Sequence, residues 1–197
     1  MESKLSNEFV LSEIFQSSYE TKNKFYEVAE LFVIILGSFL IPFVLGHPQL
    51  LVGTLVNSLL IISAVRIKDY KIIFPIILPS IAALSRALLF GPFTKYLLFM
   101  LPFIWLGNLL LVIFIKLIGL YLEKGIIAAG SFGSAVKAGF LFSSAFLLFK
   151  TGLVPKAFLT AFGITQFATA LAGLAVAYPI VKITSTRRRF VKGHARR

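Results

Sequence analysis

The 197-residue chain contains no cysteine, only eight acidic residues and only two histidines. Without cysteine the protein can form no disulfide, no thiolate metal site and no cysteine nucleophile. The histidines, His47 and His194, stand in a predicted turn and in a basic tail, so a metal centre is not expected. The sequence also has no HExxH motif, no phosphate-binding glycine loop and no paired carboxylates in its apolar segments. These absences argue against an enzyme and against a resident cofactor.

Hydrophobic residues make up 58% of the chain and charged residues 14%, whereas soluble domains have about half and about a quarter. The charges are clustered, and several long stretches have almost none. A soluble fold of this size could not cover that much apolar surface with so few polar residues. The composition therefore predicts a membrane protein.

Six segments approach the roughly 20 apolar residues that a transmembrane helix needs. They are residues 28–45, 50–65, 72–90, 96–122, 125–149 and 156–181. The connections between them are short, which predicts an all-α, compact bundle of six antiparallel membrane helices without a second domain. We divide the chain into an N-terminal segment (1–27), the membrane domain (28–182) and a basic tail (183–197).

The lysines and arginines predict the orientation of the bundle, because they are enriched in cytoplasmic loops. With the N-terminus inside, only Lys95, Lys150 and Lys156 lie on the outer side. The inner side then carries Lys4, Lys22, Lys24, Arg66, Lys68, Lys71, Lys116, Lys124, Lys182 and the six further basic residues of the tail. We therefore predict a protein of the cell membrane with both termini in the cytoplasm.

The net charge of +12 would suggest a nucleic-acid partner in a soluble protein. Here the tail ends in RRRFVKGHARR (187–197), so anionic lipid is the expected partner and nucleic acid is not. The N-terminal segment holds five of the eight acids. It is predicted either to be partly disordered or to form an amphipathic helix on the inner leaflet, with Phe9, Ile14, Phe15 and Tyr19 as its apolar contacts.

Lys116 lies near the inner end of the fourth span and is assigned to the inner side, but two other basic residues, Arg86 and Lys137, are predicted to lie at membrane depth, where ionisable groups are costly. Arg86, near the outer end of the third span, either snorkels to the headgroups or lines a site. Lys137 lies about midway along the fifth span, and no Asp or Glu occurs in any span beyond Glu30. Lys137 is therefore either neutral or solvated by carbonyls near GSFGS (130–134), or it awaits the anionic group of a ligand.

Other polar residues in the spans are Asn57, Trp105, Asn108, Gln166 and Thr169. Each of them either joins neighbouring helices by a hydrogen bond or lines a cavity shared by several helices. Small residues also recur four apart, as in Ala129/Gly133, Ala135/Gly139, Ala168/Ala172 and Gly173/Ala177. Such pairs let helices approach closely, so we expect tight packing between the fifth and sixth spans.

Two stretches carry a resemblance to a known family: GHPQLLVGTLVNSLL (46–60) and RALLFGPFTKYLLFMLPFIWLGN (86–108). Together with six short spans, they resemble the substrate-binding S components of energy-coupling factor (ECF) transporters over roughly residues 30–182. The first predicted helix departs from that family, because it has Ala29, Gly37 and Ser38 but no AxxxA pair for docking a coupling subunit.

The resemblance implies capture of a vitamin, a cofactor precursor or a metal ion at the outer side, and transport with a transmembrane coupling subunit and ATPase subunits. It implies a substrate pocket among His47, Gln49, Asn57, Arg86, Trp105, Asn108, Lys137 and Gln166. Within that pocket, the basic side chains of Arg86 and Lys137 favour a ligand with a carboxylate or phosphate. A non-transporting scaffold and a small ion-gradient-driven carrier or channel stay open as alternatives.

Overall fold

The structure, a computed structural model, describes residues 10–20, 23–90, 94–185 and 189–191. It is helical apart from two three-residue strands, which confirms the all-α prediction. After a short helix at residues 10–16, the elements in chain order are β1 (Ser18–Glu20), α2 (Lys24–Leu40), the π-helical turn η1 (Ile41–Leu45), α3 (Gln49–Arg66), the 3-10 turn η2 (Asp69–Ile72), α4 (Ile73–Phe90), α5 (Thr94–Phe114), the π-helical segment η3 (Ile115–Tyr121), α6 (Ile126–Lys150), α7 (Ala157–Phe162), α8 (Ile164–Ser185) and β2 (Arg189–Val191).

Five helical segments are long and apolar enough to cross a bilayer. They are Lys24–Leu45, Gln49–Arg66, Lys95–Tyr121, Ile126–Lys150 and Ala157–Ser185. Each matches a predicted span to within a few residues, so the membrane character of the chain is confirmed. The helix α4 forms where the third span is expected, but its side chains from residue 87 onward lie outside the described part. The count of six spans stays a prediction.

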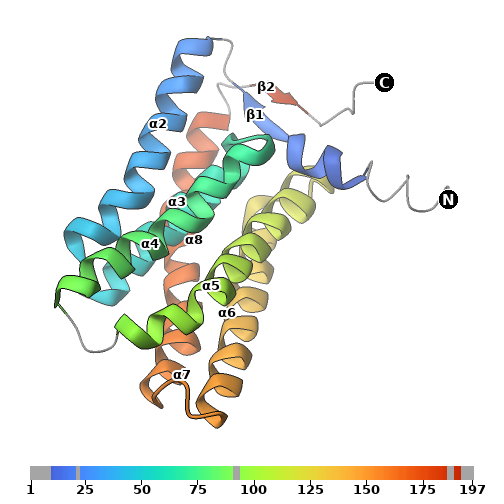
Figure 1. Cartoon of the computed structure of the whole chain (residues 1–197). Coiled ribbons are helices and arrows are strands. Elements are labelled where there is room, and N and C mark those ends of the chain that lie inside the picture. Colours follow the sequence, from blue (N-terminus) through green and yellow to red (C-terminus); the bar gives the residue numbers. More distant parts are fainter. Residues whose placement is uncertain (1–9, 21–22, 91–93, 186–188, 192–197) are drawn as a thin grey trace, which may run out of the picture.

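The helices alternate in direction, so the bundle has two distinct ends (Figure 1). At one end α2 begins and α3 and α8 finish, and we call it the basic end because it carries Lys24, Arg66, Lys68, Lys71, Lys124 and Lys182. The opposite end carries the turn at residues 46–48 and the link between α6 and α7.

Helix α3 is the centre of the packing and contacts α8, α5, α2 and α4. Its Leu60, Ile61, Ala64 and Val65 are at most 1% exposed and repeat with helical spacing, so one face of α3 is buried in the main core. A smaller core at the opposite end joins α5, α6 and α7 around Met100, Leu141 and Phe158.

Glycine on α8 brings this helix close to α3. A Cβ added to Gly173 would lie 2.8 Å from Asn57 Cβ and 2.8 Å from the backbone N of Ser58. We expected Gly173 to pack against the fifth span, and this prediction is wrong: Gly173 faces α3. Helices α6 and α8 do pack together, through Gly130 against Leu174.

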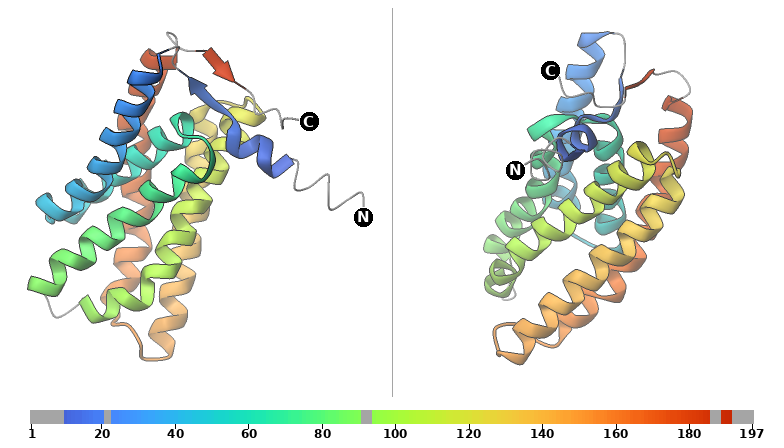
Figure 2. Two further views of the ribbon diagram at one scale, coloured as in Figure 1. Left: turned by 45° about the horizontal axis from the view of Figure 1, so that its top comes forward. Right: turned by 90° about the vertical axis from the view of Figure 1, so that its right-hand side faces the viewer.

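The N-terminal residues 10–20 pack on the basic end of the bundle (Figure 2). Ser17 and Ser18 are fully buried and Ile14 is 4% exposed, while Phe15 and Tyr19 pack against the main core. The strand β1 pairs antiparallel with β2. Ile14, expected to contact lipid, is therefore covered by protein; Phe9 lies outside the described residues.

Lys116 fixes this segment to the bundle. Its Nζ donates to the carbonyl oxygens of Ser17 (2.9 Å) and Ile67 (3.0 Å), and the residue is 0% exposed. The charge distribution assigned Lys116 to the inner side without predicting any contact for it. Lys116 instead lies in the π-helical segment η3 and joins three parts of the chain.

Candidate functional site

Three polar side chains form a hydrogen-bonded chain near the middle of α6 and α3 and in the first half of α8. Lys137 Nζ donates to Asn57 Oδ1 (2.6 Å), and Asn57 Nδ2 donates to Thr169 Oγ1 (3.2 Å). Thr169 Oγ1 in turn donates to the carbonyl oxygen of Gln166 (3.2 Å). Lys137, Asn57 and Thr169 are each at most 2% exposed, so this hydrogen-bonded chain is buried inside the protein.

Two glycines, one on α3 and one on α8, allow Asn57 and Thr169 to come together. Gly53 and Asn57 are one helical turn apart on α3, and Thr169 and Gly173 are one turn apart on α8. Gly53 faces Thr169, because an added Cβ would lie 2.9 Å from Thr169 Cγ2, and Gly173 faces Asn57 in the same way. The two helices can therefore approach until the amide and the hydroxyl form a hydrogen bond.

Lys137 has no acidic partner among the residues that the structure describes. Helices α3 to α8 contain no Asp or Glu, and Asn57 offers only a neutral oxygen. An ammonium group has three donors, and among the described residues one of them is used. Ser134, one turn before Lys137 on α6, is fully buried, and its Oγ has no hydrogen-bond partner in the described part of the chain. Lys137 and Ser134 thus supply unused donors to one region between the helices.

Trp105 and Asn108 form a second polar group, between α5 and α4. Trp105 Nε1 donates to Ser80 Oγ (2.7 Å), and Asn108 Nδ2 donates to the carbonyl oxygen of Ile76 (2.9 Å). Ser80 Oγ donates in turn to the carbonyl oxygen of Ile77 (2.8 Å) on its own helix. Trp105 and Asn108 thus each donate to an acceptor on α4, as expected of polar groups that join membrane helices.

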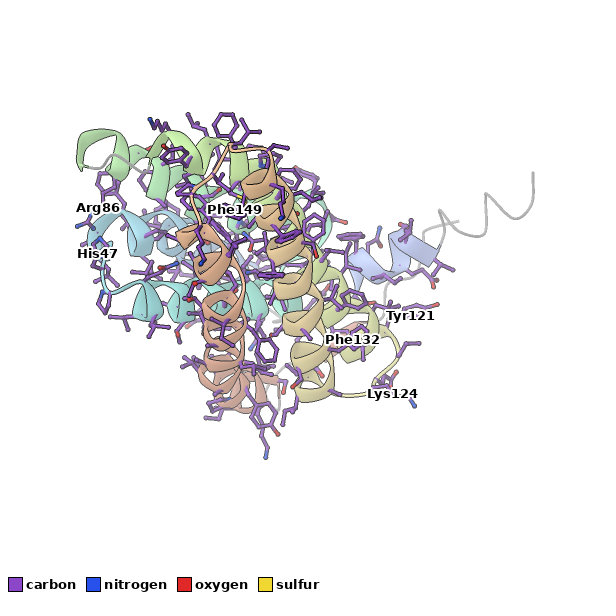
Figure 3. All side chains as sticks on the ribbon, turned by 90° about the horizontal axis from the view of Figure 1, so that it is seen from below. His47, Arg86, Tyr121, Lys124, Phe132 and Phe149 are labelled. Carbon is purple, nitrogen blue, oxygen red and sulfur yellow. The ribbon has the colours of Figure 1, made fainter. Side chains whose placement is uncertain are left out.

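The remaining predicted site residues lie at the opposite end. Arg86 Nη1 donates to the carbonyl oxygens of Phe43 (2.9 Å) and Val44 (2.6 Å), which end the helical turn η1 and lack partners within it. His47 and Arg86 lie close together at this end, seen from below in Figure 3. His47 and Gln49 are exposed. Arg86 therefore serves as a cap for the end of η1 in this structure.

No family model, no curated protein and no solved structure matches this chain. The interpretation of the site therefore depends on its own chemistry. The described residues contain no group of three or more His, Asp or Glu side chains that could hold a metal ion. What they do contain is a buried lysine with a neutral acceptor and unused hydrogen-bond donors.

The eight residues predicted to line one substrate pocket thus lie at three separate places in the structure. Asn57, Lys137 and the backbone of Gln166 meet at the centre, Trp105 and Asn108 join α5 to α4, and the other three lie at the opposite end. The predicted set omitted Thr169 and Ser134. The signal for both was in the sequence, since Thr169 precedes Gly173 by four residues and Ser134 precedes Lys137 by three.

Proposed function

We propose that this protein is a membrane-embedded substrate-binding subunit for the uptake of a small anionic solute, bound at Lys137 between α3, α6 and α8. One observation carries the proposal: Lys137 is 2% exposed near the midpoint of α6, and its only described hydrogen bond goes to the neutral oxygen of Asn57. A cation in such a place is expensive unless an anion or a functional role compensates for it. A carboxylate or phosphate of a solute would supply that anion.

The depth of this group also supports a transport role. Transporters commonly bind their substrates near the middle of the bilayer, where helices with polar residues face one another. Here three helices contribute, and the close contacts at Gly53 and Gly173 keep two of them in register. Lys137 and Ser134 are both buried, so we expect a solute to reach them only when the helices move apart on the side of Ser134, away from the tight α3–α8 contact.

The finer topology belongs to the same proposal. With α4 as a sixth span, both termini lie in the cytoplasm and the turn with His47 and Gln49 faces outward. The resemblance to S components then suggests a vitamin or cofactor precursor as the solute, with a coupling subunit and ATPases as partners. Because the first helix lacks the AxxxA pair, a subunit that works alone is an equal expectation.

The test compares Lys137→Met with Lys150→Met, the same substitution at an exposed lysine at the end of the same helix. Unfolding of the detergent-solubilised proteins is followed with acetate, succinate, benzoate or inorganic phosphate added. We expect at least one of these anions to raise the unfolding midpoint of wild type and of Lys150→Met, because a ligand that binds only the folded state stabilises it. Lys137→Met should not respond. An equal response of Lys137→Met would overturn the proposal.

A scaffold without a ligand is the second candidate function. It is favoured by the hydrogen bonds of Trp105 and Asn108, which join α5 to α4. A scaffold predicts that no anion changes the midpoint of any of the three proteins. Both candidates predict that Lys137→Met folds with only a modest loss of stability, because the substitution removes a buried amine without a counter-ion but leaves Asn57 Oδ1 without its donor.

A further inference from the structure

A cavity of about 330 Å³ opens at the basic end, between β1, the start of α2 and the end of α3. It is separate from the Lys137 site. Its charged lining residues are balanced, with the acids Glu20, Glu27, Glu30 and Asp69 and the bases Lys24, Arg66, Lys68 and Lys71. A cavity that is rich in charge but neutral as a whole suits a ligand that itself carries both signs.

Ion pairs within the walls engage half of these charges. Arg66 Nε lies 3.5 Å from Glu30 Oε1, and Lys68 pairs with Glu20. The other four, Lys24, Glu27, Asp69 and Lys71, are exposed and form no ion pair among the residues that the structure describes. Two cations and two anions are therefore available to a ligand.

Lys116 fixes two of the segments that form the walls of the cavity. The carbonyls that Lys116 binds belong to Ser17, next to β1, and to Ile67, next to the end of α3. Tyr19 and Glu20 on one side and Ile67 and Lys68 on the other line the cavity. The cavity is thus a built feature of the fold.

An apolar groove continues from this cavity along α2 and α3. It has a volume of about 450 Å³ and is lined by Ala29, Val33, Leu59 and Ile62, together with Glu30 and Ile34, which also line the charged cavity. The outer surface of α2 is apolar here, with Val28, Phe32 and Val33 more than 60% exposed. In a membrane this surface faces the hydrocarbon chains of lipid.

We propose that the cavity and the groove together bind one phospholipid with a zwitterionic headgroup. The phosphate would lie against Lys24 and Lys71, the ammonium group against Glu27 and Asp69, and one acyl chain along Val33 and Leu59. The arrangement follows the lipid's own structure, with charge at the membrane surface and an apolar chain leading inward. A purely anionic headgroup would gain from the lysines but be repelled by the two acids.

The experiment is native mass spectrometry of the delipidated protein titrated with phosphatidylethanolamine or phosphatidylglycerol of the same acyl chains. We expect one phosphatidylethanolamine to bind about fivefold more tightly than phosphatidylglycerol, as a few exposed ion pairs would give. Glu27→Gln/Asp69→Asn should remove this preference, because it removes the partners of the ammonium group. Lys24→Ala/Lys71→Ala should weaken the binding of phosphatidylethanolamine, because it removes the partners of the phosphate. The control Lys124→Ala/Lys182→Ala changes the net charge by the same amount at the same end but outside the cavity, and should bind phosphatidylethanolamine as wild type does.

A second variant tests the contribution of the acyl chain to binding separately from that of the headgroup. Ala29→Phe fills the groove at a half-buried position on the lipid-facing helix, so the protein should fold but bind phosphatidylethanolamine at least fivefold more weakly. Soluble glycerophosphoethanolamine, which has no acyl chain, should bind far more weakly than the lipid. Tighter binding of phosphatidylglycerol, equal loss in the control, full binding in Ala29→Phe, or equally tight binding of glycerophosphoethanolamine would each overturn the proposal.

Discussion

Asn57→Leu is expected to lower the free energy of unfolding by about 3 kcal/mol, because it removes the one described acceptor of a buried lysine. Leucine is close to asparagine in shape, so the loss of packing should be small. What remains is an ammonium group with no partner at the centre of the bundle. The substitution also removes the hydrogen bond from Asn57 to Thr169.

The double variant Asn57→Leu/Lys137→Met should recover most of this loss. With both partners apolar, no buried donor is left unsatisfied, so the effects of the two substitutions are strongly non-additive. The measurement is a double-mutant cycle from denaturant titrations in one detergent. If the double variant were as unstable as Asn57→Leu alone, the cost would lie in packing, and the ammonium group would not need Asn57.

Gly173→Ala is expected to cost about 2 kcal/mol, the usual price of overpacking a tight core. The added methyl group would lie 2.8 Å from Asn57 Cβ, 2.8 Å from Ser58 N and 2.9 Å from Thr54 O. Two of these atoms belong to the backbone of α3, so no side-chain rotation relieves the contact. Helix α8 has to move away from α3, and the hydrogen bond between Asn57 and Thr169 lengthens.

Gly139→Ala on α6 is the matched control for this prediction. A Cβ at Gly139 has no other atom within 4 Å, and alanine favours the helix over glycine. Its free energy of unfolding should therefore be unchanged or higher. The two variants are compared by denaturant titration, and equal stabilities would show that α3 and α8 do not approach as closely as described here.

The positions of the helices could be predicted from the sequence because length and hydropathy alone determine where a chain can cross a bilayer. The predicted spans agree with the five apolar helical segments to within a few residues. The contacts between helices could not be predicted, because they depend on how each helix is rotated about its axis. Asn57 and Lys137 are 80 residues apart in the chain, and nothing local indicates that they meet.

The burial of Lys116 and of the N-terminal segment could not be predicted from the sequence for a different reason. In the sequence Lys116 lies six residues before the end of the fourth predicted span, a position equally typical of a lysine that extends to the membrane surface and of a buried one. Its burial requires hydrogen-bond acceptors, and these are the carbonyl oxygens of Ser17 and Ile67 in distant parts of the chain. The acidic, amphipathic pattern of residues 1–27 likewise gave no sign that Ser17 and Ser18 are fully buried.

The central claim is that Lys137 binds an anion, and the most direct test is native mass spectrometry of protein purified gently from its own membrane. We predict a small-molecule adduct with an anionic group on wild type and on Lys150→Met, absent from Lys137→Met although that variant is folded. The adduct's mass would also identify the class of solute. A bare protein mass for wild type in several detergents, or an adduct retained in full by Lys137→Met, would contradict the account.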